Sequence, residues 1–138
     1  MFGEIHHIGF VYKNGEEAVK KFKSLFGIEK FNRIDMGVVK VARSMIGKLQ
    51  IDLIEPQDKK SIFYTFLENV NVGLHHIGFL VENIDEKIKD WDSKGFKQVL
   101  GGIISPAKFV YFDTTDILGH ILEFLQLNYK VGVNARKN

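Results

Sequence analysis

The chain has 138 residues, the length of a single domain, so we expect no second large catalytic domain. Hydrophobic residues make up 45%, charged residues 26%, and there are two prolines, a composition typical of a packed globular protein. The 19 Lys and Arg are interspersed with 17 Asp and Glu, so no basic stripe indicates binding to nucleic acid or to an anionic membrane. Without cysteine, thiolate catalysis, disulfides, Fe–S clusters and cysteine zinc sites are excluded. A metal would need His, Asp, Glu or Gln as ligands.

The first residues, MFGEIHHIGF, lack the basic start and long apolar run of a signal peptide. No apolar stretch approaches the roughly 18 residues of a membrane span. We therefore expect a soluble cytoplasmic protein with no membrane partner.

An internal repeat organises the chain. Residues 5–24 align without a gap to residues 74–93, and the run HHIGF occurs at the same place in both segments. Asn14 of the first copy matches Asn83 of the second, and further identities follow in register. Two copies of one supersecondary unit, related by a pseudo-twofold axis, are the natural interpretation.

The residue pattern of each copy predicts one strand, one helix and three further strands. Asn14 and Asn83 are expected to cap the two helices, and Gly27 and Gly95 to end them in left-handed backbone. In chain order we expect a strand over 5–12, a helix after Asn14, strands over 28–36, 37–44 and 47–55, a linking helix over about 58–70, a strand over 74–81, a helix after Asn83, and strands over 96–104, 108–114 and 119–127. The fold class is therefore α+β, a single domain over 1–138 with two βαβββ modules at about 3–56 and 72–128.

One histidine of each HHIGF run is a candidate for chemistry. Neighbouring side chains of a strand point to opposite faces, so the two histidines of one run cannot share a site. His7 shares its face with Gly9, and His76 with Gly78, and a glycine leaves room beside an imidazole. Taken singly, each histidine fits a structural role better. Their equivalent positions favour a site in which the pseudo-twofold axis brings His7 and His76 together.

The last strand of each copy carries a carboxylate in an apolar run: Asp52 in LQIDLIEP and Glu123 in HILEFLQ. Burying a carboxylate is costly unless a cation or a proton accompanies it, so each is expected to have a partner. The alternative is that these side chains face solvent, as we expect for Glu55. Two imidazoles and two carboxylates would suit one divalent metal ion, Zn, Ni, Co, Mn or Fe.

With these features the chain resembles the vicinal oxygen chelate superfamily, which includes glyoxalase I, methylmalonyl-CoA epimerase, extradiol dioxygenases, and fosfomycin- and bleomycin-resistance proteins. The resemblance covers nearly the whole chain, and LHHIGFLVENIDE, LIEP and LEFLQ are most similar to the epimerase and glyoxalase-like branch. It implies a cupped metal-binding sheet with ligands at His7, Asp52, His76 and Glu123. Asp52 is a departure, because relatives commonly have Glu or Gln there.

A second departure concerns proton transfer. The epimerases carry a glutamate on the strand before the first carboxylate strand, and our alignment places Lys40 at that position. Lys40 could act as a base if burial lowered its pKa, could hold a substrate carboxylate or phosphate, or could be an ordinary solvated lysine. Tyr111 aligns with Lys40 in the repeat and is expected to line the same cavity. The alternative for Tyr111 is a packed aromatic residue.

The resemblance implies a metal-dependent lyase or isomerase that abstracts a proton next to a carbonyl, with Glu123 as the base. Its small-molecule substrate would be a hemithioacetal, as for glyoxalase I, or an acyl thioester, as for methylmalonyl-CoA epimerase. Two other classes stay open. One is a non-catalytic binding protein of the bleomycin-resistance kind. The other is a dioxygenase or fosfomycin-resistance-type relative that uses two His and one carboxylate and leaves Asp52 a spectator. A homodimer is open as well.

Overall fold

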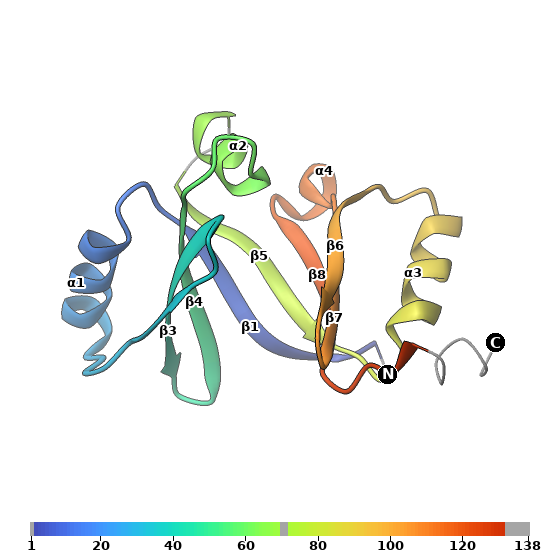
Figure 1. The fold of residues 1–138 in the computed structure, drawn as a ribbon, viewed down its shortest axis with the longest axis horizontal. Helices are drawn as coiled ribbons and strands as arrows, with labels where there is room; N and C mark the ends of the chain where they lie inside the picture. Colours follow the sequence, from blue (N-terminus) through green and yellow to red (C-terminus); the bar gives the residue numbers. More distant parts are fainter. Residues whose placement is uncertain (1, 70–71, 132–138) are drawn as a thin grey trace. The chain divides into compact units, whose positions relative to one another are not determined.

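A computed structural model describes residues 2–69 and 72–131 of the chain. The described part is a mixed α+β fold, as predicted, with eight strands and four helices (Figure 1). In chain order these are β1 (Glu4–Val11), α1 (Gly15–Phe26), β2 (Asn32–Asp35), β3 (Val39–Ile46), β4 (Leu49–Pro56), α2 (Ile62–Asn69), β5 (Gly73–Leu80), α3 (Ile84–Ser93), β6 (Gln98–Ile104), β7 (Ala107–Phe112), α4 (Thr115–Leu118) and β8 (Ile121–Gln126). Within these ranges no helix combines the length and the apolar character that a membrane span requires.

The βαβββ repeat is confirmed. The first copy runs from β1 through α1 to β4, and the second from β5 through α3 to β8. The linking helix is α2, although Val70, the last residue of its predicted range, lies outside the described residues. One element was not predicted, the single turn of α4, in which the Thr114 hydroxyl donates to the His120 carbonyl at 2.6 Å.

The chain divides into two compact units that differ slightly from the predicted modules. The N-terminal unit comprises residues 7–76, and the C-terminal unit comprises the residues from 77 onward together with the first six. The linking helix α2 therefore belongs to the N-terminal unit. The start of the chain belongs to the C-terminal unit, where the Phe2 ring packs edge-on against Phe79 with the ring centroids 5.0 Å apart.

In the N-terminal unit, α1 covers one face of strands ordered β2-β3-β4-β1. β4 runs parallel to β1 and antiparallel to β3. The core between α1 and this face is made of Ala18, Val19, Phe22, Phe31, Ala42, Ile51 and Leu53. Because side chains alternate along each strand, His7, Gly9 and Asp52 lie on the opposite face.

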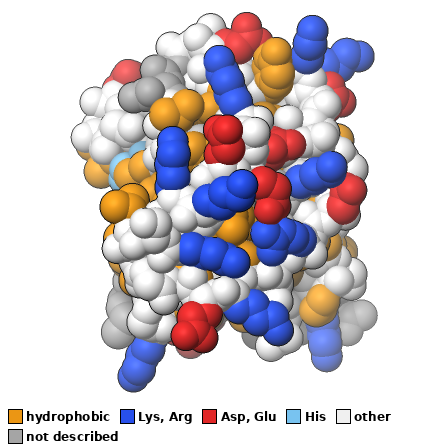
Figure 2. Space-filling model, turned by 90° about the vertical axis from the view of Figure 1, so that its left-hand side faces the viewer, with side chains coloured by type: hydrophobic (Ala, Val, Ile, Leu, Met, Phe, Trp, Pro, Cys, Tyr) orange, Lys and Arg blue, Asp and Glu red, His pale blue; other side chains and the backbone are white. Residues whose placement is uncertain are grey.

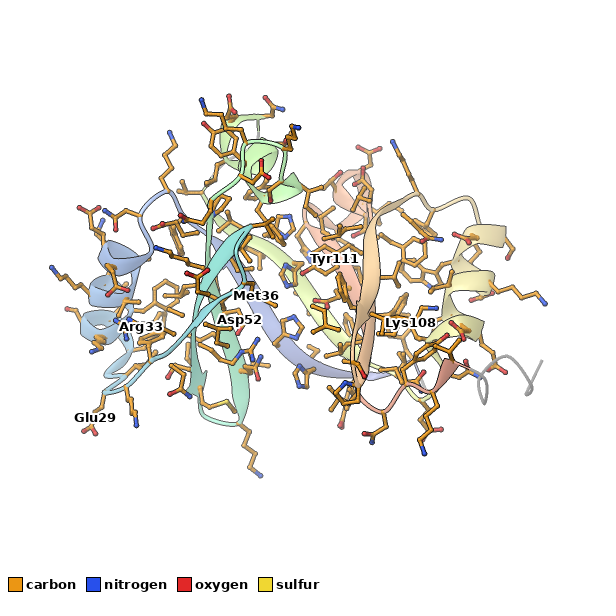
Figure 3. All side chains as sticks on the ribbon, in the orientation of Figure 1. Glu29, Arg33, Met36, Asp52, Lys108 and Tyr111 are labelled. Carbon is orange, nitrogen blue, oxygen red and sulfur yellow. The ribbon has the colours of Figure 1, made fainter. Side chains whose placement is uncertain are left out.

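The C-terminal unit repeats this plan, with α3 packed on strands ordered β5-β8-β7-β6. Its core is made of Val81, Ile84, Trp91, Val110, Phe112, Leu122 and Phe124. A half-buried ion pair ties β7 to the first turn of α3, with the Lys108 ammonium 2.6 Å from an Asp85 carboxylate oxygen (Figure 3). Tyr111 and Glu123 lie on the face opposite to α3, since Val110 and Phe124 point into the core.

Both long helices begin as predicted. The side-chain oxygen of Asn14 accepts the backbone N–H of Glu17, and that of Asn83 accepts the backbone N–H of Glu86. At the other end of α1, Gly27 has φ = 67°, the left-handed backbone that favours glycine.

A second cap on each helix was not predicted. The Glu55 carboxylate, expected to face solvent, instead accepts the Gly15 N–H at 2.7 Å. Its counterpart Gln126 accepts the Ile84 N–H at 3.0 Å. A residue near the end of each carboxylate strand therefore satisfies the first amide of the long helix in its unit.

The outer face over α1 carries Lys and Arg side chains interspersed with Asp and Glu (Figure 2). This face therefore has mixed charge, as the distribution along the sequence predicted.

Candidate metal centre

His7 and His76 meet within the N-terminal unit. His7 lies on β1 and His76 on β5, and their Nε2 atoms are 3.2 Å apart. Both side chains are buried, with 5% and 1% of their surface exposed. The two histidines selected from the repeat thus come together with the same nitrogen of each ring directed at the other.

Gly9 makes this approach feasible. A Cβ atom built on Gly9 would overlap the imidazole ring of His76, so any side chain at this position would displace that ring. Gly9 shares its strand face with His7. The room expected beside His7 is therefore filled by the second imidazole.

The spacing of the two nitrogens fits a shared metal ion. Imidazole nitrogens bind Zn²⁺ at about 2.0–2.1 Å, so two ligands in tetrahedral geometry lie about 3.3 Å apart. The observed 3.2 Å falls at this value. The pair therefore fits two positions in the coordination sphere of a small divalent cation without movement of the backbone.

His75 contacts the His76 ring at the nitrogen that does not face His7. Its Nδ1 is 2.8 Å from the Nδ1 of His76. On the side of α2, the rings of Phe63 and Phe66 pack on His75 with centroid distances of 4.8 and 4.9 Å. Burial among these rings lowers the pKa of His75 from 6.5 to about 4, so the ring is neutral at pH 7.

Asp52 is buried, which rejects the solvent-facing alternative, but its carboxylate is held by an arginine (Figure 3). Arg43 lies opposite Asp52 in the β3–β4 register, and its Nε and Nη2 donate to the two carboxylate oxygens at 2.7 and 3.1 Å. Gln50 adds a third contact at 3.3 Å. Among the described residues Asp52 belongs to no cluster of three or more metal-binding side chains. The geometry thus favours Asp52 as an ion-pair partner.

Glu123 is the corresponding carboxylate of the C-terminal unit. It lies on β8 with 5% of its surface exposed, so here too the solvent-facing alternative is rejected. Tyr111 is its direct neighbour in the β7–β8 register and is likewise buried. Tyr111 therefore lies beside Glu123 on one sheet face.

The registers correct the predicted equivalence of Lys40 and Tyr111. Tyr111 lies opposite Glu123, and the residue opposite Asp52 is Arg43. Lys40 lies opposite Glu55, three residues further along, on the face covered by α1. There it is exposed and borders a cavity of about 380 Å³. The side chain points away from the face of Asp52, so this geometry does not support a role in proton transfer.

Comparison with known proteins gives the family. The profile of the glyoxalase/bleomycin resistance protein/dioxygenase superfamily matches residues 6–112, more than three-quarters of the chain. The chain belongs to this superfamily. The match covers His7, Asp52 and His76.

Among curated relatives, an uncharacterized protein from Bacillus subtilis is 29% identical over 87 residues, 62% of each chain. The mitochondrial methylmalonyl-CoA epimerase of Dictyostelium discoideum is 30% identical over 91 residues, 63% of this chain and 54% of the relative. The chain thus covers less than two-thirds of the length of either one. Among solved structures, Streptomyces coelicolor methylmalonyl-CoA epimerase in complex with 2-nitronate-propionyl-CoA has a TM-score of 0.72 at 21% identity, covering 92% of this chain and 99% of that one.

Two residues of the site, Arg43 and His75, were not predicted from the sequence. Arg43 could have been found, because a buried aspartate needs a cation and a tight β3–β4 hairpin pairs residues 43 and 52. His75 was set aside because strand alternation turns it away from His76. Alternation gives the direction of a side chain from the sheet, but it did not indicate that the Nδ1 atoms of adjacent histidines would meet.

Proposed function

We propose that this chain is a metal-dependent enzyme that removes a proton from a carbon next to a carbonyl. His7, His76 and Glu123 would hold one divalent cation, Zn, Ni, Co, Mn or Fe. The observation that carries this proposal is the pair of buried Nε2 atoms 3.2 Å apart. Two buried imidazoles with no apolar group between these nitrogens form a donor pair suited to a cation.

Glu123 supplies the third donor in this proposal, and Asp52 does not. Both are buried carboxylates on equivalent strands, but Arg43 already neutralises Asp52. A carboxylate oxygen is an ordinary ligand of divalent cations, and Glu123 would bind the ion through one. Three protein ligands leave coordination positions for substrate, as catalytic metal sites require.

The metal, when bound, supplies Lewis acidity toward neighbouring oxygens of the substrate. Glu123 would accept the proton from the adjacent carbon on one carboxylate oxygen and return it later. Tyr111, next to Glu123 in the register, would place its hydroxyl near the reacting group and orient the substrate. Ile121 and Leu125, which share the strand face of Glu123, would limit the access of water.

The comparisons support an acyl thioester as the first substrate class to test. The relative from Dictyostelium discoideum is named a methylmalonyl-CoA epimerase, and the epimerase of similar fold from Streptomyces coelicolor was solved with an acyl-CoA. A hemithioacetal is the second class, because glyoxalase I chemistry also begins with removal of such a proton. The position of Lys40 on the α1 face leaves epimerisation without a second base from that residue.

A ring-cleaving dioxygenase activity is the second candidate. The Arg43–Asp52 ion pair favours it, since it leaves two histidines and one carboxylate, the facial set typical of non-haem iron enzymes. Oxygen uptake by the Fe²⁺-loaded protein with a catechol tests this activity.

The deciding experiment measures metal content and proton exchange together. Purified untagged protein is analysed for metals beside a His7→Ala/His76→Ala double variant shown to be folded by circular dichroism. We expect about one divalent ion per chain in the wild type and none in the double variant. Solvent deuterium exchange is then followed by NMR in methylmalonyl-CoA and in the hemithioacetal of methylglyoxal and glutathione, with Glu123→Gln as the control.

Two results would overturn the proposal. If the wild type binds none of Zn, Ni, Co, Mn or Fe after reconstitution, the metal site does not exist and a metal-free binding protein becomes the better hypothesis. If metal binds but neither substrate exchanges deuterium faster than in Glu123→Gln, the proposed proton abstraction from these substrates is wrong.

A further inference from the structure

The contact between His75 and His76 joins the Nδ1 atoms of two neighbouring rings at 2.8 Å. A neutral imidazole has one N–H and one nitrogen with a lone pair. At this distance only one proton fits between the two nitrogens. One ring must therefore donate and the other accept, and the direction fixes the tautomer of both.

The two directions have opposite consequences for a metal ion. If His76 donates from Nδ1, its Nε2 keeps the lone pair, which points toward the Nε2 of His7. If His75 donates instead, a neutral His76 carries its proton on Nε2, aimed at His7 across 3.2 Å. A protonated nitrogen cannot bind a cation, so only the first direction makes the pair a metal site.

The fold holds His75 in place for the accepting role. Phe63 and Phe66 of α2 pack against its ring, which has 2% of its surface exposed. The equivalent residue of the first copy, His6, is only half-buried. In the second copy, the two phenylalanine rings of α2 fix the first histidine of the HHIGF run.

We propose that His75 is a positioning residue that accepts the Nδ1 proton of His76 and so directs the Nε2 lone pair of His76 at the metal. The inference rests on the metal site of the proposed function and adds a role for a residue outside the ligand set. Partners of ligand histidines fix ring orientation and tautomer in this way, and their removal typically costs 10–100-fold in metal affinity.

The test measures Zn²⁺ affinity by competition with a chromophoric chelator in four proteins: wild type, His75→Phe, His75→Asn and His6→Phe. Phenylalanine keeps an aromatic ring between the two phenylalanines but has no acceptor. Asparagine places an amide oxygen near the position of Nδ1. We expect His75→Phe to bind Zn²⁺ about 10–100-fold more weakly, His75→Asn to recover most of that loss, and His6→Phe to match the wild type.

Long-range ¹H–¹⁵N NMR of the Zn²⁺-loaded wild type provides a second readout that does not depend on the variants folding. We expect a protonated Nδ1 in His76 and an unprotonated Nδ1 in His75. The reverse assignment would overturn the inference, and so would wild-type affinity in a folded His75→Phe protein. Loss of affinity that asparagine fails to recover would also count against it, because loosened packing would then explain the loss.

The outcomes also separate this inference from the proposed function. If the wild type binds no metal, both are wrong. If the wild type binds Zn²⁺ through His7 and His76 while His75→Phe binds it equally well, the metal site stands and only the role of His75 is rejected.

Discussion

The carboxylate strands of the two units carry the same residue pattern but differ in what lies opposite the acid. In the N-terminal unit Arg43 forms a bidentate ion pair with Asp52, and in the C-terminal unit Tyr111 lies beside Glu123. A guanidinium neutralises a buried carboxylate permanently, whereas a phenol does not. The two copies of one unit therefore place different side chains opposite their buried carboxylates, a guanidinium in one and a phenol in the other.

The largest expected effect distinguishes these two acids. Glu123→Gln should slow α-proton exchange by about 10²–10⁴-fold, because an amide cannot take the proton. Asp52→Asn should leave Zn²⁺ affinity within a few-fold of the wild type, since its carboxylate is held by Arg43. Metal titration and deuterium exchange on both variants measure this contrast. A clear loss of metal in Asp52→Asn would restore Asp52 as a fourth ligand and remove the distinction between the two units.

The two HHIGF runs also differ, because the first histidine is buried in the second run and half-buried in the first. The dependence of stability on acid pH should reveal this difference. His75 has a pKa of about 4 in the folded protein and about 6.5 when unfolded. Below pH 6.5 His75 binds a proton in the unfolded chain but stays neutral in the folded protein. Its contribution to the free energy of unfolding is therefore fully present above pH 6.5 and is lost as the pH falls toward 4. Over this range the free energy of unfolding should fall by about 3 kcal/mol. Urea unfolding of metal-free protein from pH 7 to 4 measures it, and His75→Phe should lose this part of the slope. An unchanged slope in that variant would assign the acid sensitivity to other groups.

A glycine from each unit gives a smaller contrast. Alanine at Gly9 would overlap the His76 ring, whereas a Cβ at Gly102 in β6 would meet only the Phe109 ring at 3.6 Å. We expect Gly9→Ala to lower the free energy of unfolding by about 1–3 kcal/mol and to weaken Zn²⁺ binding. Gly102→Ala should do neither. Equal stability and Zn²⁺ affinity in the two variants would mean that His76 can move without cost, and that its approach to His7 does not depend on Gly9.

Periodicity and local spacing in the sequence determine some features of this fold and not others. The repeat gave both βαβββ units and both Asn caps, because local spacing and capping chemistry determine them. It also selected His7 and His76, which the structure brings together. Alignment alone paired Lys40 with Tyr111, an error of three residues along β3 that the hydrogen-bonded register corrects. Because side chains alternate, an odd shift moves a residue to the other face of the sheet. The cap formed by Glu55 was missed because it joins residues 40 positions apart.

That second cap provides the smallest contrast between the units. Glu55 and Gln126 accept the first amide of α1 and α3 respectively, but Glu55 carries charge and is half-buried, while Gln126 is neutral and buried. Methionine at either position keeps the length of the side chain and removes the oxygen. Gln126→Met should cost about 1–3 kcal/mol, because the buried Ile84 amide is left without this acceptor. Glu55→Met should cost only about 0.3–1 kcal/mol, the range for a charge near an exposed helix N-terminus.

The salt dependence of stability tests whether charge or burial determines which of the two substitutions costs more. The contribution of Glu55 acts partly through the helix dipole, so 1 M NaCl should shrink the difference between wild type and Glu55→Met. The neutral Gln126 cap should contribute nearly the same at both salt concentrations. Urea unfolding of both variants at low and high NaCl makes the measurement. If Glu55→Met proved the more damaging at low salt, the charge at the start of α1 would outweigh the buried amide of α3. The two units would then differ in how their helices are anchored as well as in how their carboxylates are used.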